Sequence, residues 1–132
     1  RSYWMENSVS IWCGNFKNAQ ALEAFLEMSY DEEAMPQSAF MNQFDICYYD
    51  NDFQEAYCDE KAQEGLSIKQ LVEPLSYAES YLPMILETNK TYNSIIALYN
   101  FSYENVQTSG ANVDFLGVFK YNTKIEISKR KS

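Results

Sequence analysis

Two alternating apolar segments near the end of the chain constrain its fold more than any other feature. In residues 95–103 every second side chain is Ile, Ala, Tyr or Phe, and residues 113–121 repeat this alternation with Val, Phe, Gly and Tyr. A period of two is typical of β-strands, because successive strand side chains point to opposite faces of a sheet. The intervening QTSGAN, residues 107–112, is rich in turn-forming residues. We therefore predict an antiparallel C-terminal hairpin with a loose loop.

A further strand is predicted near the start of the chain. The segment VSIWCGNF, residues 9–16, is rich in β-branched and aromatic residues and ends near a glycine. Asn18 then suits the N-cap of a helix that we expect to end near Tyr30. Pro36 suits the first turn of a second helix, whose apolar face would contain Phe40, Met41 and Phe44.

The middle of the chain contains three further helix-start signals. Residues 46–49 are either a short strand or an extended loop, after which Asp52 and Glu55 predict a capped helical turn. Ser67 and Gln70 form a capping box, the strongest local signal in the chain. A third cap at Ser76 predicts a helix over the apolar residues that follow, which Pro83 either shortens or kinks.

The order of strand, helices and hairpin predicts an α+β domain. We expect a small antiparallel sheet, formed by the N-terminal strand and the C-terminal hairpin, with several helices packed on one face. KIEIS, residues 124–128, is a candidate fourth strand. We expect one domain over residues 9–127, between an N-terminal extension (residues 1–8) and a basic tail (residues 128–132). Residues 1–4, RSYW, are either native or foreign to a natural chain that starts at Met5.

Charge is distributed very unevenly along the sequence. The whole chain carries −9, but residues 27–64 contain eleven acids and the single base Lys61, and the rest of the chain is close to neutral. We call residues 27–64 the acidic segment. An acidic field repels nucleic acid and anionic membranes and speeds encounter with basic proteins. We therefore expect no nucleic-acid or membrane partner, and a basic protein partner.

The sequence contains few of the residue patterns that carry chemistry. It has no histidine, and its three cysteines, Cys13, Cys47 and Cys58, show no CxxC spacing. Asp50, Asp52 and Glu55 resemble the start of a calcium loop, but the glycine and glutamate that an EF-hand requires at positions six and twelve are missing. We predict no catalytic, metal or cofactor site. With no secretion leader and no long apolar run, we expect a cytoplasmic protein, a monomer by default.

Several segments in the same order resemble the immunity protein 22 family of bacterial polymorphic toxin systems. The similarity begins at IWCGNF (residues 11–16), continues through ALEAFLEMSYDEE, FDICYYDNDFQEAY and SIKQLVEPLSYAESYL, and closes with IALYNFSYE and FLGVFKY. The family usually has an aliphatic residue where Cys13 stands, a conservative difference. The resemblance implies a non-catalytic protein that binds and blocks a cognate toxin domain.

The residues and the resemblance together predict an immunity protein whose acidic, aromatic face covers a basic, nuclease-type toxin. Carboxylates would supply the electrostatic field, and tyrosines would supply the anchoring area. The residues predicted to bind the partner are Asp31, Glu32, Glu33, Tyr48, Tyr49, Asp50, Asp52, Glu55, Tyr57, Asp59 and Glu60. Two alternatives remain open: an acidic adaptor or regulatory module with a different partner, and an enzyme that works through carboxylates alone.

Overall fold

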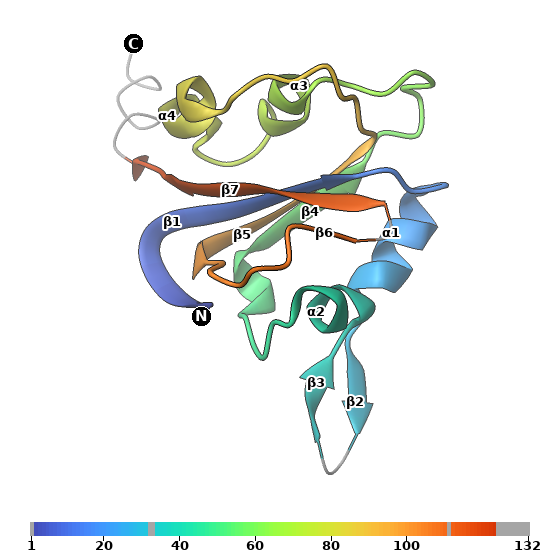
Figure 1. The fold of residues 1–132 in the computed structure, drawn as a ribbon, viewed down its shortest axis with the longest axis vertical. Helices are drawn as coiled ribbons and strands as arrows, with labels where there is room; N and C mark the ends of the chain where they lie inside the picture. The colour runs from blue at the N-terminus through green and yellow to red at the C-terminus, as the bar shows by residue number, and fades with distance from the viewer. Residues whose placement is uncertain (1, 32–33, 111, 124–132) are drawn as a thin grey trace.

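The computed structural model describes residues 2–31, 34–110 and 112–123, without the side chains of Asp31 and Ala34 (Figure 1). Its centre is a five-stranded antiparallel sheet in the order β4-β5-β1-β7-β6. In chain order these strands are β1 (Tyr3–Gly14), β4 (Gln54–Cys58), β5 (Ser94–Ser102), β6 (Ser109–Gly110) and β7 (Val113–Lys120). A separate two-stranded hairpin, which we call the β2–β3 hairpin, consists of β2 (Ser29–Asp31) and β3 (Ala34–Gln37).

The helices that accompany the sheet are short. The α-helices are α1 (Ala19–Leu26), α2 (Ala39–Phe44), α3 (Ile68–Val72) and α4 (Ala78–Tyr81), and the 3-10 helices are η1 (Asn51–Phe53) and η2 (Leu82–Met84). The α3–α4 segment covers one face of the sheet, and α1 and α2 lie toward the other (Figure 1).

Strand β1 occupies the middle of the sheet and pairs antiparallel with both β5 and β7. The predicted C-terminal hairpin is therefore wrong, because β5 and β7 are separated by β1 and are not neighbours. Residues 8–14 of β1 are all buried. A strand whose side chains are buried on both faces suits the middle of a sheet that is covered on both sides, where its two edges are also hydrogen-bonded.

The predicted α+β architecture, with several helices packed on one face of a small sheet, is also wrong. Most of the regular structure in the described residues is β-sheet, and α1, the longest helix there, has only eight residues. Local signals predicted helix at two places where the chain instead forms a strand by pairing with another strand. Residues 54–58 form β4 by pairing with β5, and Pro36 lies in β3. The candidate strand at residues 124–128 lies outside the described residues.

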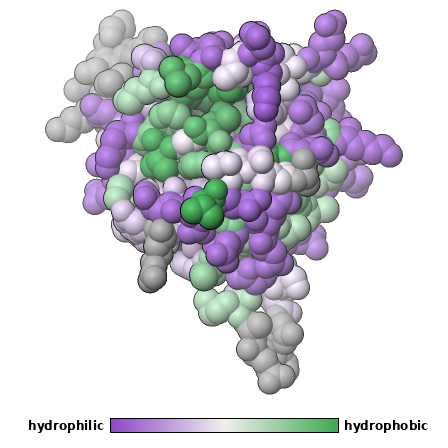
Figure 2. Space-filling model, in the orientation of Figure 1, coloured by the Kyte–Doolittle hydropathy of each residue, from purple (hydrophilic) through white to green (hydrophobic). Residues whose placement is uncertain are grey.

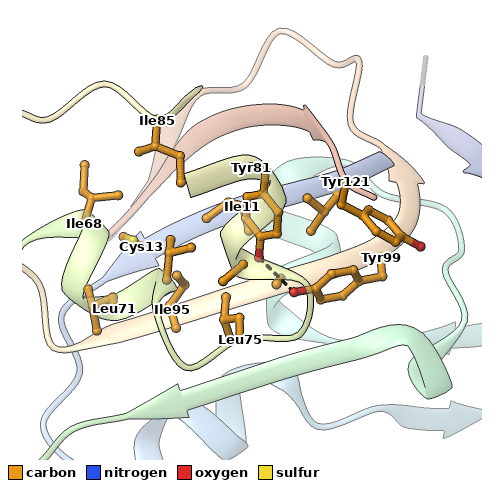
Figure 3. Close-up of a cluster of buried hydrophobic side chains, with 14 of the residues drawn as sticks. Ile11, Cys13, Ile68, Leu71, Leu75, Tyr81, Ile85, Ile95, Tyr99 and Tyr121 are labelled. Carbon is orange, nitrogen blue, oxygen red and sulfur yellow. Dashed lines mark hydrogen bonds between the residues drawn. The ribbon is translucent and has the colours of Figure 1, made fainter. Parts of the chain in front are cut away.

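Buried side chains form one cluster on each face of the sheet. The first cluster, between the sheet and α3–α4, includes Ile11, Cys13, Leu71, Tyr81, Ile95 and Tyr99 (Figure 3). The second cluster lies against α1 and α2 and is centred on Trp12, whose ring packs edge-on against Phe40 at a centroid distance of 4.9 Å. The predicted apolar face Phe40, Met41 and Phe44 is confirmed, since all three are buried in this second cluster.

Local capping signals had mixed outcomes. The Oδ1 atom of Asn18 accepts from the amide of Ala21 at 2.9 Å, and both bonds of the Ser67–Gln70 capping box are present, so these two helix starts are confirmed. The predicted cap at Ser76 is wrong, because α4 begins after Tyr77 with no side-chain cap. The predicted cap at Asp52 is displaced to Asp50, which precedes η1.

Candidate functional site

The structure separates the predicted partner-binding residues into three groups. The first belongs to the β2–β3 hairpin, the second to the segment from Tyr48 to Glu55, and the third to the far end of β4 and the loop after it. Gln54 pairs with Leu98 at one end of β5, and Cys58 pairs with Ser94 at the other. With about 3.3 Å per strand residue, Glu55 and Asp59 are on the order of 13 Å apart along the chain.

The β2–β3 hairpin projects from the body of the molecule beyond α2 (Figure 1). Asp31 ends β2, while Glu32 and Glu33 lie outside the described residues. Tyr30 and Met35 on the two strands are both largely exposed. The hairpin therefore presents an aromatic ring and a thioether on either side of its acidic tip sequence.

The second group includes Tyr48, whose ring is 62% exposed. Asp50 caps η1, since its Oδ1 accepts from the amide of Asp52 at 2.9 Å. Asp52 is exposed, and Glu55 is half-buried on β4. Asp50 shares a cavity with Tyr48, whereas Asp52 and Glu55 line a neighbouring cavity in which the Glu55 carboxylate accepts from the amide of Ser76 at 2.9 Å.

Tyr49 and Tyr57 support the fold. Tyr49 is only 5% exposed, and its hydroxyl donates to Oε1 of Gln54 at 2.6 Å. Burial raises the pKa of Tyr49 to about 12. Tyr57 is half-buried against the first cluster and donates its hydroxyl to the carbonyl of Leu71 at 2.6 Å, which ties β4 to α3. Little surface of either ring is exposed to a binding partner.

The third group also stabilises local structure. The Oε2 atom of Glu60 accepts from the amide of Ala19 at 2.5 Å, at the N-terminus of α1, where a negative charge is favourable. Asp59 accepts from the amide of Lys61 at 3.0 Å in a turn. Glu60 is nevertheless exposed, so its charge still contributes to the external field.

Two exposed aromatic residues beside Tyr48 were not among the predicted residues. Trp4 is 58% exposed and packs edge-on against Phe53 at a centroid distance of 5.4 Å. Phe53 lies in the acidic segment, so its position in the sequence was enough to include it among the candidate binding residues. Trp4 precedes Met5 in the extension, and only its pairing with Phe101 places it beside the group. That pairing joins residues too distant in sequence to be inferred from local pattern.

Two adjoining cavities open beside the Trp4–Phe53 pair, and Tyr99 and Asn100 line both. The first has a volume of about 260 Å³ and is lined by Trp4, Tyr48, Tyr49, Asp50 and residues 98–101. The second, which we call the tyrosine pocket, has a volume of about 310 Å³. It is lined by Asp52, Phe53, Glu55, Ser76, Tyr77, Tyr99, Asn100 and Tyr121. We call the two cavities and the exposed rings of Trp4, Tyr48 and Phe53 the acidic-aromatic face.

The described residues hold no candidate metal site, and their buried thiol is inert. No group of three or more Cys, Asp or Glu side chains is placed there to hold a metal ion. Cys13 is fully buried, and burial raises the pKa of its thiol, so it is unreactive. Within the same residues, no helix has the length and apolar character that a membrane crossing requires.

Tyr, Trp and Phe are enriched in protein-binding surfaces, so the exposed rings of this face give the molecule the features of a protein-binding domain. Residues 9–122 match the family model described as Immunity protein 22, and the chain belongs to this family. The resemblance seen in the sequence is thereby confirmed. The family's role is to neutralise a cognate toxin, and its members are generally not enzymes. No curated protein and no solved structure matches the chain.

Proposed function

We propose that this immunity protein neutralises a basic, nuclease-type toxin domain in the cytoplasm by covering the toxin's active or substrate-binding surface with its acidic-aromatic face. The observation that carries this proposal is the uncompensated charge of the acidic segment. Among the described residues the one ion pair joins Lys90 and Asp114, and neither belongs to that segment. A protein that binds a nucleic-acid enzyme benefits from such a field, because the toxin surface that binds phosphate is positive.

The three groups have different parts in the proposed complex. The exposed rings of Trp4, Tyr48 and Phe53 supply desolvated contact area, which dominates the energy of most interfaces. Asp50 and Asp52 lie beside these rings and meet the basic side chains of the toxin. The β2–β3 hairpin and the Asp59–Glu60 turn lie farther out, where charges change mainly the association rate.

A second exposed surface offers an alternative docking place. Figure 2 shows a hydrophobic area near β7 and α4, and Met84 and Leu86 after α4 are exposed, Leu86 by 84%. Leu82, Leu116 and Phe119 nearby are partly buried against the first cluster. This area lacks the charge excess of the acidic segment, and for that reason we favour the acidic-aromatic face.

The test compares substitutions on the two surfaces by the kinetics of binding to the cognate toxin, obtained from the gene adjacent to this one. The acidic variant combines Glu32→Gln, Glu33→Gln, Asp52→Asn and Asp59→Asn. We expect its association rate at low salt to fall at least about tenfold, with a weaker salt dependence. The control variant combines Met84→Ser and Leu86→Ser and should bind like the unmodified protein. Unchanged kinetics in the acidic variant, or loss of binding only in the control, would overturn the proposal.

A further inference from the structure

The tyrosine pocket has aromatic walls that hold one another in place. The rings of Tyr77 and Tyr121 stack at a centroid distance of 5.2 Å, and Tyr99 meets Tyr121 edge-on at 5.3 Å. Figure 3 shows Tyr99 and Tyr121 together at one end of the first cluster, with the Tyr121 hydroxyl directed away from the aliphatic side chains. Phe53 lines the pocket from the side of η1. The pocket is therefore an aromatic cavity at the edge of the core.

Hydrogen bonds within the protein leave mainly acceptor groups in this cavity. The hydroxyl of Tyr121 donates to Oδ1 of Asn100 at 2.6 Å, and the hydroxyl of Tyr99 donates to the carbonyl of Ser76 at 2.6 Å. The hydroxyl and the amide of Ser76 both donate to the carboxylate of Glu55. The Tyr99 hydroxyl also meets the Tyr81 hydroxyl at 2.8 Å, so its oxygen is engaged as well. The remaining lone pairs of the Glu55 and Asp52 carboxylates favour a ligand that donates.

Negative charge adds to this preference. Glu55 and Asp52 both line the pocket, and neither forms an ion pair with another described residue. Burial and then the neighbouring Tyr81 raise the pKa of Tyr99, and the field of Glu55 adds to this shift. Burial and then Tyr77 raise the pKa of Tyr121, and Glu6 adds in the same direction. The nearest base in the chain, Lys120 beside Tyr121, is engaged elsewhere, because its Nζ donates to Oγ of Ser8 at 3.1 Å.

We propose that the tyrosine pocket binds one arginine side chain of the toxin. The guanidinium group would stack on the tyrosine rings and donate to Glu55 and Asp52. A guanidinium has five donors, no acceptor and a planar shape that stacks on aromatic rings, whereas an ammonium is compact and more strongly hydrated. The proposal rests on the proposed function for the source of the arginine, but the chemistry of the pocket can be tested without the toxin.

The test is an NMR titration of the full chain with acetyl-arginine amide, with acetyl-citrulline amide as the uncharged isostere. The amide of Ser76 is the best reporter, because it donates to Oε1 of Glu55 at 2.9 Å. We expect saturable shifts at Ser76, Tyr77 and Asn100 with the arginine probe only. Asp52→Asn and Glu55→Gln should each weaken binding by about tenfold, since each removes a charge-assisted contact. The exposed acid Glu64 provides the control, and Glu64→Gln should leave binding unchanged.

Two outcomes would overturn the pocket itself: equal shifts with the citrulline probe, or arginine-dependent shifts that disappear in Glu64→Gln. A third outcome would assign the pocket to this chain's own basic residues 129–131, which lie outside the described residues. In that case Lys129→Ala, Arg130→Ala and Lys131→Ala together would shift Ser76 without any probe and strengthen arginine binding.

Binding to the toxin then separates this inference from the proposed function. If Glu55→Gln binds the toxin normally while the acidic variant does not, the assignment of a toxin arginine to the pocket fails and the proposed function survives. If the acidic variant also binds normally, the proposed function fails, whatever the pocket binds. Loss of toxin affinity in Glu55→Gln, together with the expected titration, supports both.

Discussion

The amide of Asn7 donates to Oδ1 of Asn100 at 2.9 Å, and both asparagines have left-handed backbone conformations, with φ of 63° and 57°. The β1–β5 register shifts at this point, between Trp4 and Val9. The same Oδ1 accepts from the hydroxyl of Tyr121, whose amide donates to the carbonyl of Asn7 at 2.9 Å. One side chain thus joins three separate parts of the chain directly beside the tyrosine pocket.

Replacing Asn100 should reduce stability in a way that depends on the new residue. Asn100→Ala loses both hydrogen bonds and forces a β-carbon without local compensation into the left-handed region, and we expect the free energy of unfolding to fall by about 2–3 kcal/mol. Asn100→Gly loses the hydrogen bonds but tolerates the conformation, so it should cost less than alanine. Urea denaturation of the two variants measures the difference. Equal stability of both variants and the unmodified protein would contradict the proposed role of Asn100.

Alkaline pH should destabilise the protein through its buried tyrosines. Burial raises the pKa of Tyr49 to about 12 from an ordinary value near 10, so the native state holds this proton more tightly than the unfolded state. The resulting stabilisation is complete below pH 10 and is lost as the pH rises through about 12. We expect the free energy of unfolding to fall over this range, and to fall less steeply in Tyr49→Phe. Parallel curves for the two proteins would contradict this prediction.

The three cysteines should differ strongly in reactivity. Cys47 is exposed, Cys58 is half-buried and Cys13 is buried. Iodoacetamide should modify Cys47 first and Cys58 more slowly, and should reach Cys13 only on unfolding. Mass spectrometry of tryptic peptides measures the order. Because Cys47 precedes Tyr48, bound toxin should protect it, and rapid modification of Cys47 in the complex would contradict docking on the acidic-aromatic face.

Strands and capped helices were predictable where the signal is local, but the faces of the strands were not. Alternation predicted that Phe101 and Tyr103 share a face with Ile95 and Tyr99, yet they lie in the second cluster and the other two in the first. The conformation of Asn100 reverses the alternation at this point. β7 changes face in the same way at Leu116, the extra residue between the pairs Trp12–Phe115 and Ile11–Gly117. Such bulges depend on pairing with β1, which sequence periodicity does not reveal.

The candidate site was predictable as a region of charge but not as a surface. The acidic segment is continuous in sequence, but the chain passes from the β2–β3 hairpin through α2 and η1 to β4. This path distributes the carboxylates over three places. Composition also could not distinguish Tyr48 from its neighbour Tyr49, because only the packing of Tyr49 against Phe40 and Phe101 shows which ring is buried. Long-range contacts determine both where the carboxylates lie and which of the two tyrosines is buried.

The contrast between Tyr48 and Tyr57 gives the sharpest prediction about the binding surface. Tyr48→Ala removes an exposed ring, so we expect toxin affinity to fall about 10–100-fold while the free energy of unfolding stays within about 0.5 kcal/mol. Tyr57→Phe removes the hydrogen bond to Leu71, so stability should fall by about 1 kcal/mol with little change in affinity. Calorimetric titration with the toxin and urea denaturation measure the two quantities. If instead Tyr57→Phe weakens toxin binding and Tyr48→Ala does not, the toxin contacts the far end of β4, and the acidic-aromatic face is not the centre of the interface.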